Sequence, residues 1–150
     1  MRLTLHSDYA LRLMMLLAVE KGQLHKIERV AERYNISYNH LMKVSQKLTQ
    51  AGYVESVRGR GGGLRLAQDC QDINIGKLVR ITEDNFNIVE CFDKAKNTCQ
   101  LSSFCSLRMT LHEAFDAFIK VLDGYTLHDL VSKPYMYEGM QRTLFAENQG

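Results

Sequence analysis

A glycine-rich basic turn between two alternating segments is the feature that most constrains the fold of this chain. The turn reads RGRGGG over residues 58–63, and it separates the segment YVESV from the segment LRLA. Glycines allow positive φ angles and close backbone approach, which suits the tip of a β-hairpin. Because the turn lacks the Gly-Lys-Ser/Thr ending of a P-loop, nucleotide binding is disfavoured. The pattern predicts a hairpin wing with Arg58, Arg60 and Arg65 at its tip.

Three helical segments precede this wing. Apolar residues recur at helical spacing from Ser7, the predicted N-cap, to a stop at Gly22. A second, short helix over 26–34 ends at Asn35, which tolerates the left-handed conformation, and Ser37 caps a third helix. This third helix turns its aliphatic residues inward, namely Leu41, Val44 and Leu48. Two short helices joined by a tight turn and followed by a wing predict a mainly α fold with a small β-hairpin, the winged helix-turn-helix.

The outward face of the third helix and the wing form the predicted DNA-binding surface. In helix-turn-helix proteins the second helix reads base edges in the major groove, and basic residues beside it contact phosphates or the minor groove. The residues expected to contact double-stranded DNA are Ser37, Tyr38, Asn39, His40, Lys43, Arg58, Arg60, Gly61 and Gly62. Lys47 shares the outward face of the helix.

Charge is distributed unevenly along the chain, although the net charge of all 150 residues is only +2. Residues 1–66 hold 11 Lys or Arg and 5 Asp or Glu, whereas residues 67–150 hold 8 and 12. A basic N-terminal half attracts phosphates, and an acidic C-terminal half suits another role. Since no apolar run reaches the roughly 18 residues that a membrane span needs, we expect a cytoplasmic protein that uses no membrane.

The second half of the chain predicts a connecting helix, an irregular loop and a long helix. Asn74 caps a short helix that runs to about Thr82, and residues 85–104 contain helix breakers and little periodicity. The long helix over 103–122 has a wide apolar stripe of Leu107, Leu111, Ala114, Phe115, Phe118, Val121 and Leu122. This stripe predicts a homodimer that binds a palindromic operator, and packing of the stripe within one chain is the alternative. Thr126 caps a short closing helix.

Three cysteines, Cys91, Cys99 and Cys105, lie together in the irregular loop. Thiolates are soft ligands for iron-sulfur clusters, copper(I) and zinc. Structural zinc usually takes four ligands, often from Cys-x-x-Cys knuckles that this sequence lacks, and the odd number of cysteines in the loop disfavours disulfides. Three thiolates with one other ligand fit an iron-sulfur cluster, while three inert cysteines are the plain alternative. Cys70 lies apart, and the histidines show no metal-site spacing.

These elements predict four parts of the chain. A winged helix-turn-helix DNA-binding domain spans 1–82, and a cysteine-rich, cluster-binding loop spans 83–106. A dimerisation helix and the closing helix together span 107–131. The remaining residues, 132–150, form a C-terminal tail that we expect to be weakly ordered from Pro134 onward.

Four stretches of the chain resemble a family of winged-helix bacterial regulators that carry iron-sulfur clusters. They are MRLTLHSDYALR, NHLMKVSQKLTQAGYVESVRGRGGGLRL, INIGKLVRITEDNFNIVECFD and GYTLHDLV, and the resemblance covers nearly the whole chain. Within the family, SDYALR, NHLMKV and EDNFNIVECFD are most similar to the nitric-oxide-sensing repressors. The resemblance therefore implies a transcriptional repressor that is not an enzyme.

The same resemblance implies a cofactor and its ligands. The cluster is expected to be held by Cys91, Cys99 and Cys105 of one subunit and by an acidic residue in the partner's first helix, the position of Asp8. A carboxylate that only favours the start of its helix is the alternative for Asp8. Another branch of the family has a histidine ligand three residues after the last cysteine, where this chain has Arg108. A [4Fe-4S] cluster is preferred to [2Fe-2S], although ligand number alone does not decide between them.

The function that follows is repression relieved by nitric oxide. With the cluster bound, the dimer is expected to bind its operator, and attack of nitric oxide on the weakly held iron frees the ligands and releases the DNA. The alternatives are an iron-responsive or cluster-status regulator, a metal-stabilised protein that binds DNA constitutively, and a cluster-containing enzyme or electron carrier. The sequence shows no paired carboxylates and no Cys-His dyad, so the enzyme is disfavoured and no catalytic residue is assigned.

Overall fold

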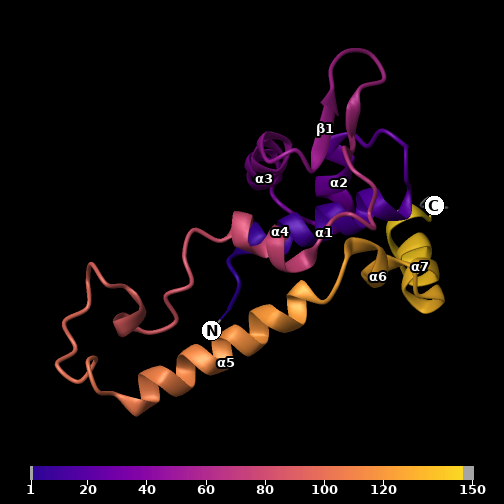
Figure 1. Ribbon diagram of the computed structural model, residues 1–150. Coiled ribbons are helices and arrows are strands. Elements are labelled where there is room, and N and C mark those ends of the chain that lie inside the picture. The colour runs from indigo at the N-terminus through magenta and orange to yellow at the C-terminus, as the bar shows by residue number, and fades with distance from the viewer. Residues whose placement is uncertain (1, 147–150) are drawn as a thin grey trace.

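The structure of the protein, a computed structural model, describes residues 2–146. In chain order its elements are α1 (Leu5–Val19), α2 (Ile27–Tyr34), α3 (Tyr38–Gln50), β1 (Val54–Val57), β2 (Gly63–Leu66), α4 (Ile75–Thr82), a 3₁₀ turn (Glu90–Phe92), α5 (Ser106–Asp123), α6 (Leu127–Val131), α7 (Pro134–Met140) and a π-helical turn (Gln141–Phe145). Figure 1 shows the hairpin projecting from a group of helices around α1, while α5 and the loop before it extend away from that group. The predicted fold class is confirmed.

The buried core lies around α1. Ala10, Leu13, Met14 and Leu16 are completely buried, and α3, α4 and α6 all pack against their helix. Helix α3 contributes the three inward residues that its periodicity predicts, Leu41, Val44 and Leu48. Burial of one such side chain stabilises a fold by about 1.5–3 kcal/mol. We refer to the helices and hairpin that share this core, residues 5–82 with α6 and α7, as the body of the protein.

The turn between α2 and α3 forms at the residues that the sequence predicts. Asn35 ends α2 in the left-handed conformation with a φ of 51°. The N–H of the next residue, Ile36, donates to the carbonyl of Ala31 at 2.9 Å, and the Ile36 side chain is buried. Ser37 occupies the N-cap position of α3 but makes no capping hydrogen bond with its side chain. The helix-turn-helix is therefore fixed by the turn and by burial rather than by the cap.

The wing is a two-stranded antiparallel hairpin that a third segment anchors to the body. Val54 pairs with Leu66 and Val57 pairs with Gly63 across the two strands. His25, which precedes α2, exchanges backbone hydrogen bonds with Leu64 of β2, at 2.9 and 2.8 Å. A Cβ atom at Gly63 would lie 2.7 Å from the carbonyl oxygen of His25, so only glycine fits there. Glycine is thus required where the wing approaches His25, as well as at the tip of the wing.

Two predicted helix starts are wrong by a few residues. The N-cap of α1 is Thr4, whose hydroxyl accepts the Ser7 N–H, and not Ser7 itself. Ser7 is completely buried inside the helix, where its hydroxyl donates to Thr82 Oγ1 at 2.9 Å. Helix α5 starts at Ser106 rather than 103, because Cys105 takes the N-cap position. Nearby serine and threonine residues compete for a cap, and tertiary partners decide between them.

The predicted caps of α4 and α6 are right. Asn74 caps α4 by accepting the N–H of Lys77 at 3.0 Å. Thr126 caps α6 in a capping box, since its hydroxyl accepts the Asp129 N–H and the Asp129 carboxylate accepts the Thr126 N–H. Hydrogen bonds of this kind satisfy backbone groups that the first turn leaves unpaired.

The prediction of a weakly ordered tail from Pro134 is wrong for the part of it that the structure describes. Pro134 takes the first position of α7, where its fixed φ and missing N–H suit a helix start. Met140 is buried in the core, and the ring of Phe145 lies 4.5 Å below the Arg33 guanidinium of α2. Tertiary packing on α1, α2 and α6 therefore orders this segment. Residues 147–150 of the predicted tail lie outside the described residues.

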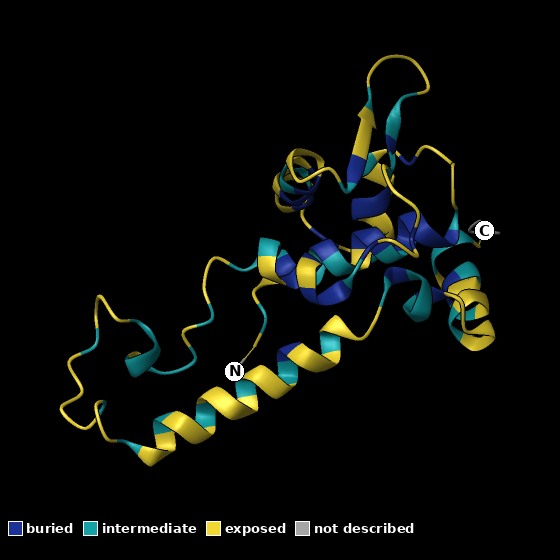
Figure 2. Cartoon of the chain, viewed as in Figure 1, coloured by how far each residue is buried: buried dark blue, intermediate teal, exposed yellow. Residues whose placement is uncertain are grey.

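Helix α5 packs on the body only near its C-terminal end. The carboxylate of Asp123 accepts two hydrogen bonds from Arg80 of α4, and among the 18 residues of α5, all of them described, only Ile119 is buried. Leu107 is 64% exposed and Val121 is 60% exposed. Figure 2 shows this contrast between the dark core and the largely exposed α5. The predicted apolar stripe is thus only partly covered by its own chain, since Leu122 packs against the core while Leu107 and Val121 stay exposed. Within the described range no helix is long and apolar enough to cross a membrane.

Candidate DNA-binding surface and cysteine loop

The residues of α3 that the sequence assigns to DNA lie on its solvent side. Ser37, Tyr38, Asn39, His40 and Lys43 are all exposed. The opposite side of the helix packs against α1 and α2. Exposed polar side chains on one face of the second helix of a helix-turn-helix are placed to meet base edges in a major groove.

A groove of about 1020 Å³ runs between α2, α3 and the wing. Arg29 of α2, Gln46 of α3 and Arg58 of the wing all line it. Arg29 and Gln46 were not singled out from the sequence, although Gln46 follows Asn39 and Lys43 at helical spacing on the same exposed face. The spacing of exposed polar residues along the whole helix face, and not only along its first turns, is the signal that identifies Gln46.

The wing tip presents two of its three predicted arginines. Arg58 and Arg60 are exposed and lie beside the turn that Gly59 and Gly61 form with φ angles of 100° and 82°. Arg65 lies on β2 instead, opposite Glu55, and the two side chains form an ion pair at 2.8 Å. The hydrogen bond from Arg65 holds the pKa of Glu55 below its usual value. The expectation that Arg65 adds charge to the tip is therefore wrong.

The glycines of the tip have separate reasons for being glycine. The N–H of Gly62 donates to the carbonyl of Gly59 at 3.0 Å, and a Cβ atom at position 62 would lie 2.2 Å from the carbonyl oxygen of Val57. At Gly61 the positive φ excludes most other residues, while the space around it is open. A tip without side chains at these two positions leaves its backbone open to close approach.

Helix α1 contacts the recognition helix α3 through aromatic residues. The rings of Tyr9 and His40 have centroids 6.4 Å apart, and both line a small cavity of about 220 Å³ with Leu5, His6 and Lys43. Burial, together with nearby Lys47, lowers the pKa of His6. Movement of the first turns of α1 would therefore be felt at His40 and Lys43 of α3.

The three loop cysteines are free thiols that the described chain does not gather into a metal site. Cys91 and Cys105 are half-buried, and Cys99 is exposed. Among residues 2–146, no group of three His, Cys, Asp or Glu side chains is placed to hold a metal ion. Residues 83–118, a stretch that the structure describes in full, contain no buried side chain. The loop has the donors but lacks a core to fix them.

Local hydrogen bonds and one stacked pair give the loop its shape. The Glu90 carboxylate accepts the backbone N–H and the hydroxyl of Thr98, and these bonds lower its pKa. The rings of Phe92 and His112 stack at 3.8 Å, which ties the start of the loop to α5. Arg108 of α5 donates to the carbonyl oxygen of Ser102 at 2.9 Å, which ties the end of the loop to the same helix.

Asp8 lies in the first turn of α1, away from the cysteines of its own chain as far as the structure describes it. Its two oxygens accept hydrogen bonds from Arg12, at 3.0 and 2.7 Å. This arrangement is an ordinary i,i+4 ion pair with an acidic residue near the positive end of a helix. A role as cluster ligand requires a cysteine loop from another chain.

The donor chemistry of the loop fits an iron-sulfur cluster. Three thiols that are not in disulfides supply the soft ligands that such clusters take. Cys105 is at the N-terminus of α5, and its Sγ accepts the backbone N–H of Arg108 at 3.4 Å. The Arg108 side chain adds a buried Nε–H that has no hydrogen-bond partner among the described residues. A sulfur-rich anionic group would satisfy this donor.

Cys70 does not belong to this donor set. It is buried beside His128, with 3.8 Å between its Sγ and Nδ1 of the histidine ring. Burial raises the pKa of the Cys70 thiol, and its contacts with Asp69 act in the same direction. A buried thiol of raised pKa is a poor ligand and a poor nucleophile, so Cys70 serves as a packing residue between the wing and α6.

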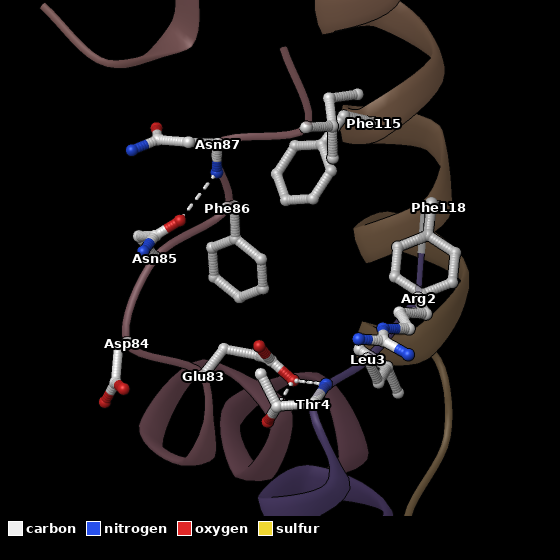
Figure 3. Close-up of a pocket in the computed structure, with 11 residues that line it drawn as sticks. Arg2, Leu3, Thr4, Glu83, Asp84, Asn85, Phe86, Asn87, Phe115 and Phe118 are labelled. Atoms are coloured by element: carbon white, nitrogen blue, oxygen red, sulfur yellow. Dashed lines mark hydrogen bonds between the residues drawn. The ribbon is translucent and has the colours of Figure 1, made fainter. Parts of the chain in front are cut away.

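A cavity of about 500 Å³ lies where the N-terminal segment, the residues after α4, and α5 meet (Figure 3). Phe86, Phe115 and Phe118 form its apolar side. On its polar side, Glu83 accepts the backbone N–H of Thr4 at 2.8 Å and its hydroxyl at 3.0 Å. These hydrogen bonds join the start of α1, which carries Asp8, to the end of α4, directly before the cysteine loop.

Comparison with known proteins gives this arrangement a context. The family model Rrf2, described as an iron-dependent transcriptional regulator, matches residues 3–133. The HTH-type transcriptional regulator NsrR of Bacillus subtilis is 58% identical over 132 residues, which cover 87% of this chain and 90% of that protein. The regulator of the same name from Geobacillus kaustophilus is 42% identical and is covered completely, as is this chain.

A solved structure agrees with the fold as well. The structure of T. potens IscR has a TM-score of 0.71 and 25% sequence identity, and the match covers 91% of this chain and 96% of that one. The named relatives are HTH-type transcriptional regulators, so this chain acts in the regulation of transcription and not as an enzyme. Because the family model matches most of its length and the sequence identity is high, the chain belongs to the Rrf2 family of transcriptional regulators.

Proposed function

We propose that this chain is a homodimeric repressor that binds DNA while it holds an iron-sulfur cluster and releases DNA when nitric oxide destroys the ligation. The observation that carries the proposal is a loop with three free thiols and no buried side chain, directly before a helix with an uncovered apolar face. A loop without a core needs a ligand or a partner to order it. The curated relatives named NsrR support the same reading.

The cluster ligands are proposed to be Cys91, Cys99 and Cys105 of one subunit and Asp8 of the partner subunit. When bound, the cluster, [4Fe-4S] in preference to [2Fe-2S], supplies iron that reacts with nitric oxide. Asp8 is held by Arg12 in the single chain, so ligation exchanges this ion pair for a contact with the partner's loop. A carboxylate ligand is weaker for iron than a thiolate, which makes it the contact that is lost first.

Dimerisation is proposed to occur through α5, with the loop over 83–106 binding the cluster and residues 107–131 forming the interface. Leu107, Met109 and Val121 are between 60% and 72% exposed. Large apolar surfaces left open to water are uncommon on monomers and often mark a protein–protein interface. A two-fold dimer places two α3 helices and two wings on one face, which requires a palindromic operator.

The link from the cluster to DNA runs through α1. Its first turn carries Asp8, its Tyr9 contacts His40 of α3, and Thr4 just before it is bound to Glu83. Loss of the Asp8 contact with the partner's loop frees this turn and alters how α3 is held. Ser37, Tyr38, Asn39, His40 and Lys43 are then proposed to lose their positions in the major groove.

The wing completes the proposed contact with the operator. Arg58 and Arg60 grip the phosphates or the minor groove, and Gly61 and Gly62 permit the close approach. The described range shows no membrane-spanning helix, and a cytoplasmic location suits a protein whose partner is operator DNA.

A second function within the same family is response to iron or cluster status. The description of the family as iron-dependent regulators favours it. The two functions differ in which treatment, nitric oxide or iron chelation, abolishes DNA binding at the lower dose. In a nitric oxide sensor, a few molecules of nitric oxide per cluster abolish DNA binding, whereas in an iron sensor a chelator does so at lower dose.

The test is anaerobic purification with iron and sulfide analysis, followed by titration of nitric oxide while absorbance and operator binding are recorded. Cys99→Ala and Asp8→Ala should lose or destabilise the cluster, and Cys70→Ala is the matched control that keeps it. Bleaching of a brown protein together with loss of DNA supports the proposal. A protein that holds zinc or no metal, and whose DNA binding ignores nitric oxide, refutes it and leaves a constitutive DNA-binding dimer.

A further inference from the structure

We propose that Arg108 is the positioning residue of the cysteine loop, holding its last turn through Ser102 and offering its unused Nε–H to sulfur. The inference rests on the proposed function, because it supposes that the loop cysteines hold an iron-sulfur cluster. It concerns a residue that binds no metal itself.

The geometry of Arg108 places it inside the loop rather than on the open surface of α5. One of its Nη atoms donates to the carbonyl oxygen of Ser102 at 2.9 Å, six residues back along the chain. Ser102 in turn donates to the carbonyl oxygen of Cys99 at 2.8 Å and accepts from the side chain of Asn97. The guanidinium therefore fixes the segment that joins Cys99 to Cys105.

The backbone of the same residue contacts a cysteine directly. The Arg108 N–H donates to Sγ of Cys105 at 3.4 Å, so one residue reaches the last thiol by its main chain and the segment before it by its side chain. Neighbouring exposed residues of α5 make no such double contact within the described structure. Arg108 thus links the helix to Cys105 and to the segment between Cys99 and Cys105.

The Nε–H of Arg108 is buried and has no hydrogen-bond partner among the described residues. A buried donor on a charged group that stays unpaired costs free energy, and native structures seldom retain one without a reason. The group that would satisfy it is an acceptor with negative charge at the loop. Cysteine thiolates and cluster sulfides are such acceptors, and hydrogen bonds to the sulfurs tune the reduction potential of a cluster.

The first measurement uses the ligand-free full chain. Hydrogen exchange of the amides in 97–105 is compared for wild type, Arg108→Gln, Arg108→Lys and the control Lys120→Gln, which removes the same charge from the far end of α5. Arg108→Gln is expected to exchange roughly fivefold faster, the factor of one lost hydrogen bond. Arg108→Lys keeps a donor for Ser102 and is expected to stay near wild type, as is Lys120→Gln.

The second measurement is the reduction potential of the reconstituted cluster, with its visible and electron paramagnetic resonance spectra. Loss of a cation and of an N–H···S bond destabilises the more negative reduced form, so the potential of Arg108→Gln should fall. Arg108→Lys keeps the charge without the planar Nε–H and should lie between Arg108→Gln and wild type. Lys120→Gln should match wild type, since its charge is screened at the far end of the helix.

The outcomes separate this inference from the proposed function. Wild-type protein without iron and sulfide refutes both. Wild-type protein that holds a cluster, with the same exchange rates and the same potential in Arg108→Gln, refutes the inference alone. A potential that changes equally in Arg108→Gln and Lys120→Gln refutes it too, since the effect is then general charge. If Arg108→Gln fails to fold by circular dichroism, the comparison of Arg108→Lys with wild type decides.

Discussion

The body of the protein and its cysteine loop are stabilised in different ways. In the body, α1 is surrounded by α3, α4 and α6, and its side chains at Ala10, Leu13 and Leu16 are completely buried. The stretch 83–118, described throughout, contains no buried side chain and is held by scattered hydrogen bonds and by ring contacts, Phe92 with His112 and Phe86 with Phe115. The body is therefore stabilised by its own core, whereas the loop and the start of α5 lack one. The proposed sensing function needs such a difference, because only a weakly held region responds to a small signal.

The largest expected effect tests whether stability really resides in the body. Leu13→Ala should lower the free energy of unfolding by about 2–5 kcal/mol, because it leaves a cavity in a close-packed core. Leu107→Ala, at a position that is 64% exposed in the single chain, should change it by no more than about 0.5 kcal/mol in dilute protein. Urea unfolding followed by circular dichroism measures both values. A large, concentration-dependent cost of Leu107→Ala would show instead that a second chain covers α5.

Gln46→Ala tests the groove between α2, α3 and the wing. If the amide of Gln46 reads a base edge, its loss should cost about 1–3 kcal/mol in binding to the operator and almost nothing in binding to random DNA. Fluorescence anisotropy with both DNAs measures the difference. Gln23→Ala, an exposed glutamine outside the groove, is the matched control. An equal loss on both DNAs would make Gln46 a backbone contact.

Arg60→Ala tests the wing in a different way. A contact with phosphate carries no sequence information, so affinity should fall about equally for operator and random DNA, and the salt dependence of binding should weaken by about one ion. Lys133→Ala, which removes a positive charge between α6 and α7, should leave the slope unchanged. A loss confined to the operator would indicate that Arg60 reads a base in the minor groove.

The smallest expected effect is a loss of folding stability at acid pH that arises from an ion pair in the body. The Lys21 ammonium donates to Asp69 at 2.6 Å and holds the pKa of that carboxyl at about 2, below its usual 3.8. Because the folded state has the lower pKa, the pair favours folding above about pH 4, and this contribution is lost as pH falls from about 4 to about 2. The pair is exposed, so the effect is small.

Asp69→Asn should therefore flatten the acid side of the stability curve, measured by thermal unfolding between pH 2 and pH 6. Glu90→Gln, a loop carboxyl whose pKa is lowered by hydrogen bonds from Thr98, serves as the comparison. It should change hydrogen exchange in the loop without changing global unfolding. If Glu90→Gln shifts global unfolding as much as Asp69→Asn does, the loop is part of the cooperative unit and the contrast with the body fails.

Local patterns predicted the body well because they repeat. The apolar spacing of α3, the left-handed Asn35 and the glycine turn of the wing each depend on a few neighbouring residues. The same patterns failed where distant residues compete. Ser7 is of a suitable type for a cap, but its hydroxyl binds Thr82, which lies 75 residues away. Thr4, which caps the helix instead, binds Glu83, which lies 79 residues away.

The candidate site was predicted unevenly for the same reason. Exposed residues of α3 and the wing arginines Arg58 and Arg60 follow from periodicity and charge, and the structure places them on the solvent side. Arg65 was misplaced because its cross-strand partner Glu55 depends on the register of the hairpin. Arg29 was missed because it lines the groove only once α2 and the wing are placed side by side.

By itself the sequence determined the order of the elements, the turn residues, the exposed face of α3 and the donor chemistry of the three loop cysteines. These depend on side-chain type and short spacings, which a chain carries before it folds. Only the tertiary structure decided that α7 packs on α1, that Arg65 is neutralised by Glu55, that Arg108 is bound to the cysteine loop, and that α5 keeps an uncovered face. Each of these features depends on where separate segments lie relative to one another in space. A single contact contributes too little free energy for the local sequence to determine that placement.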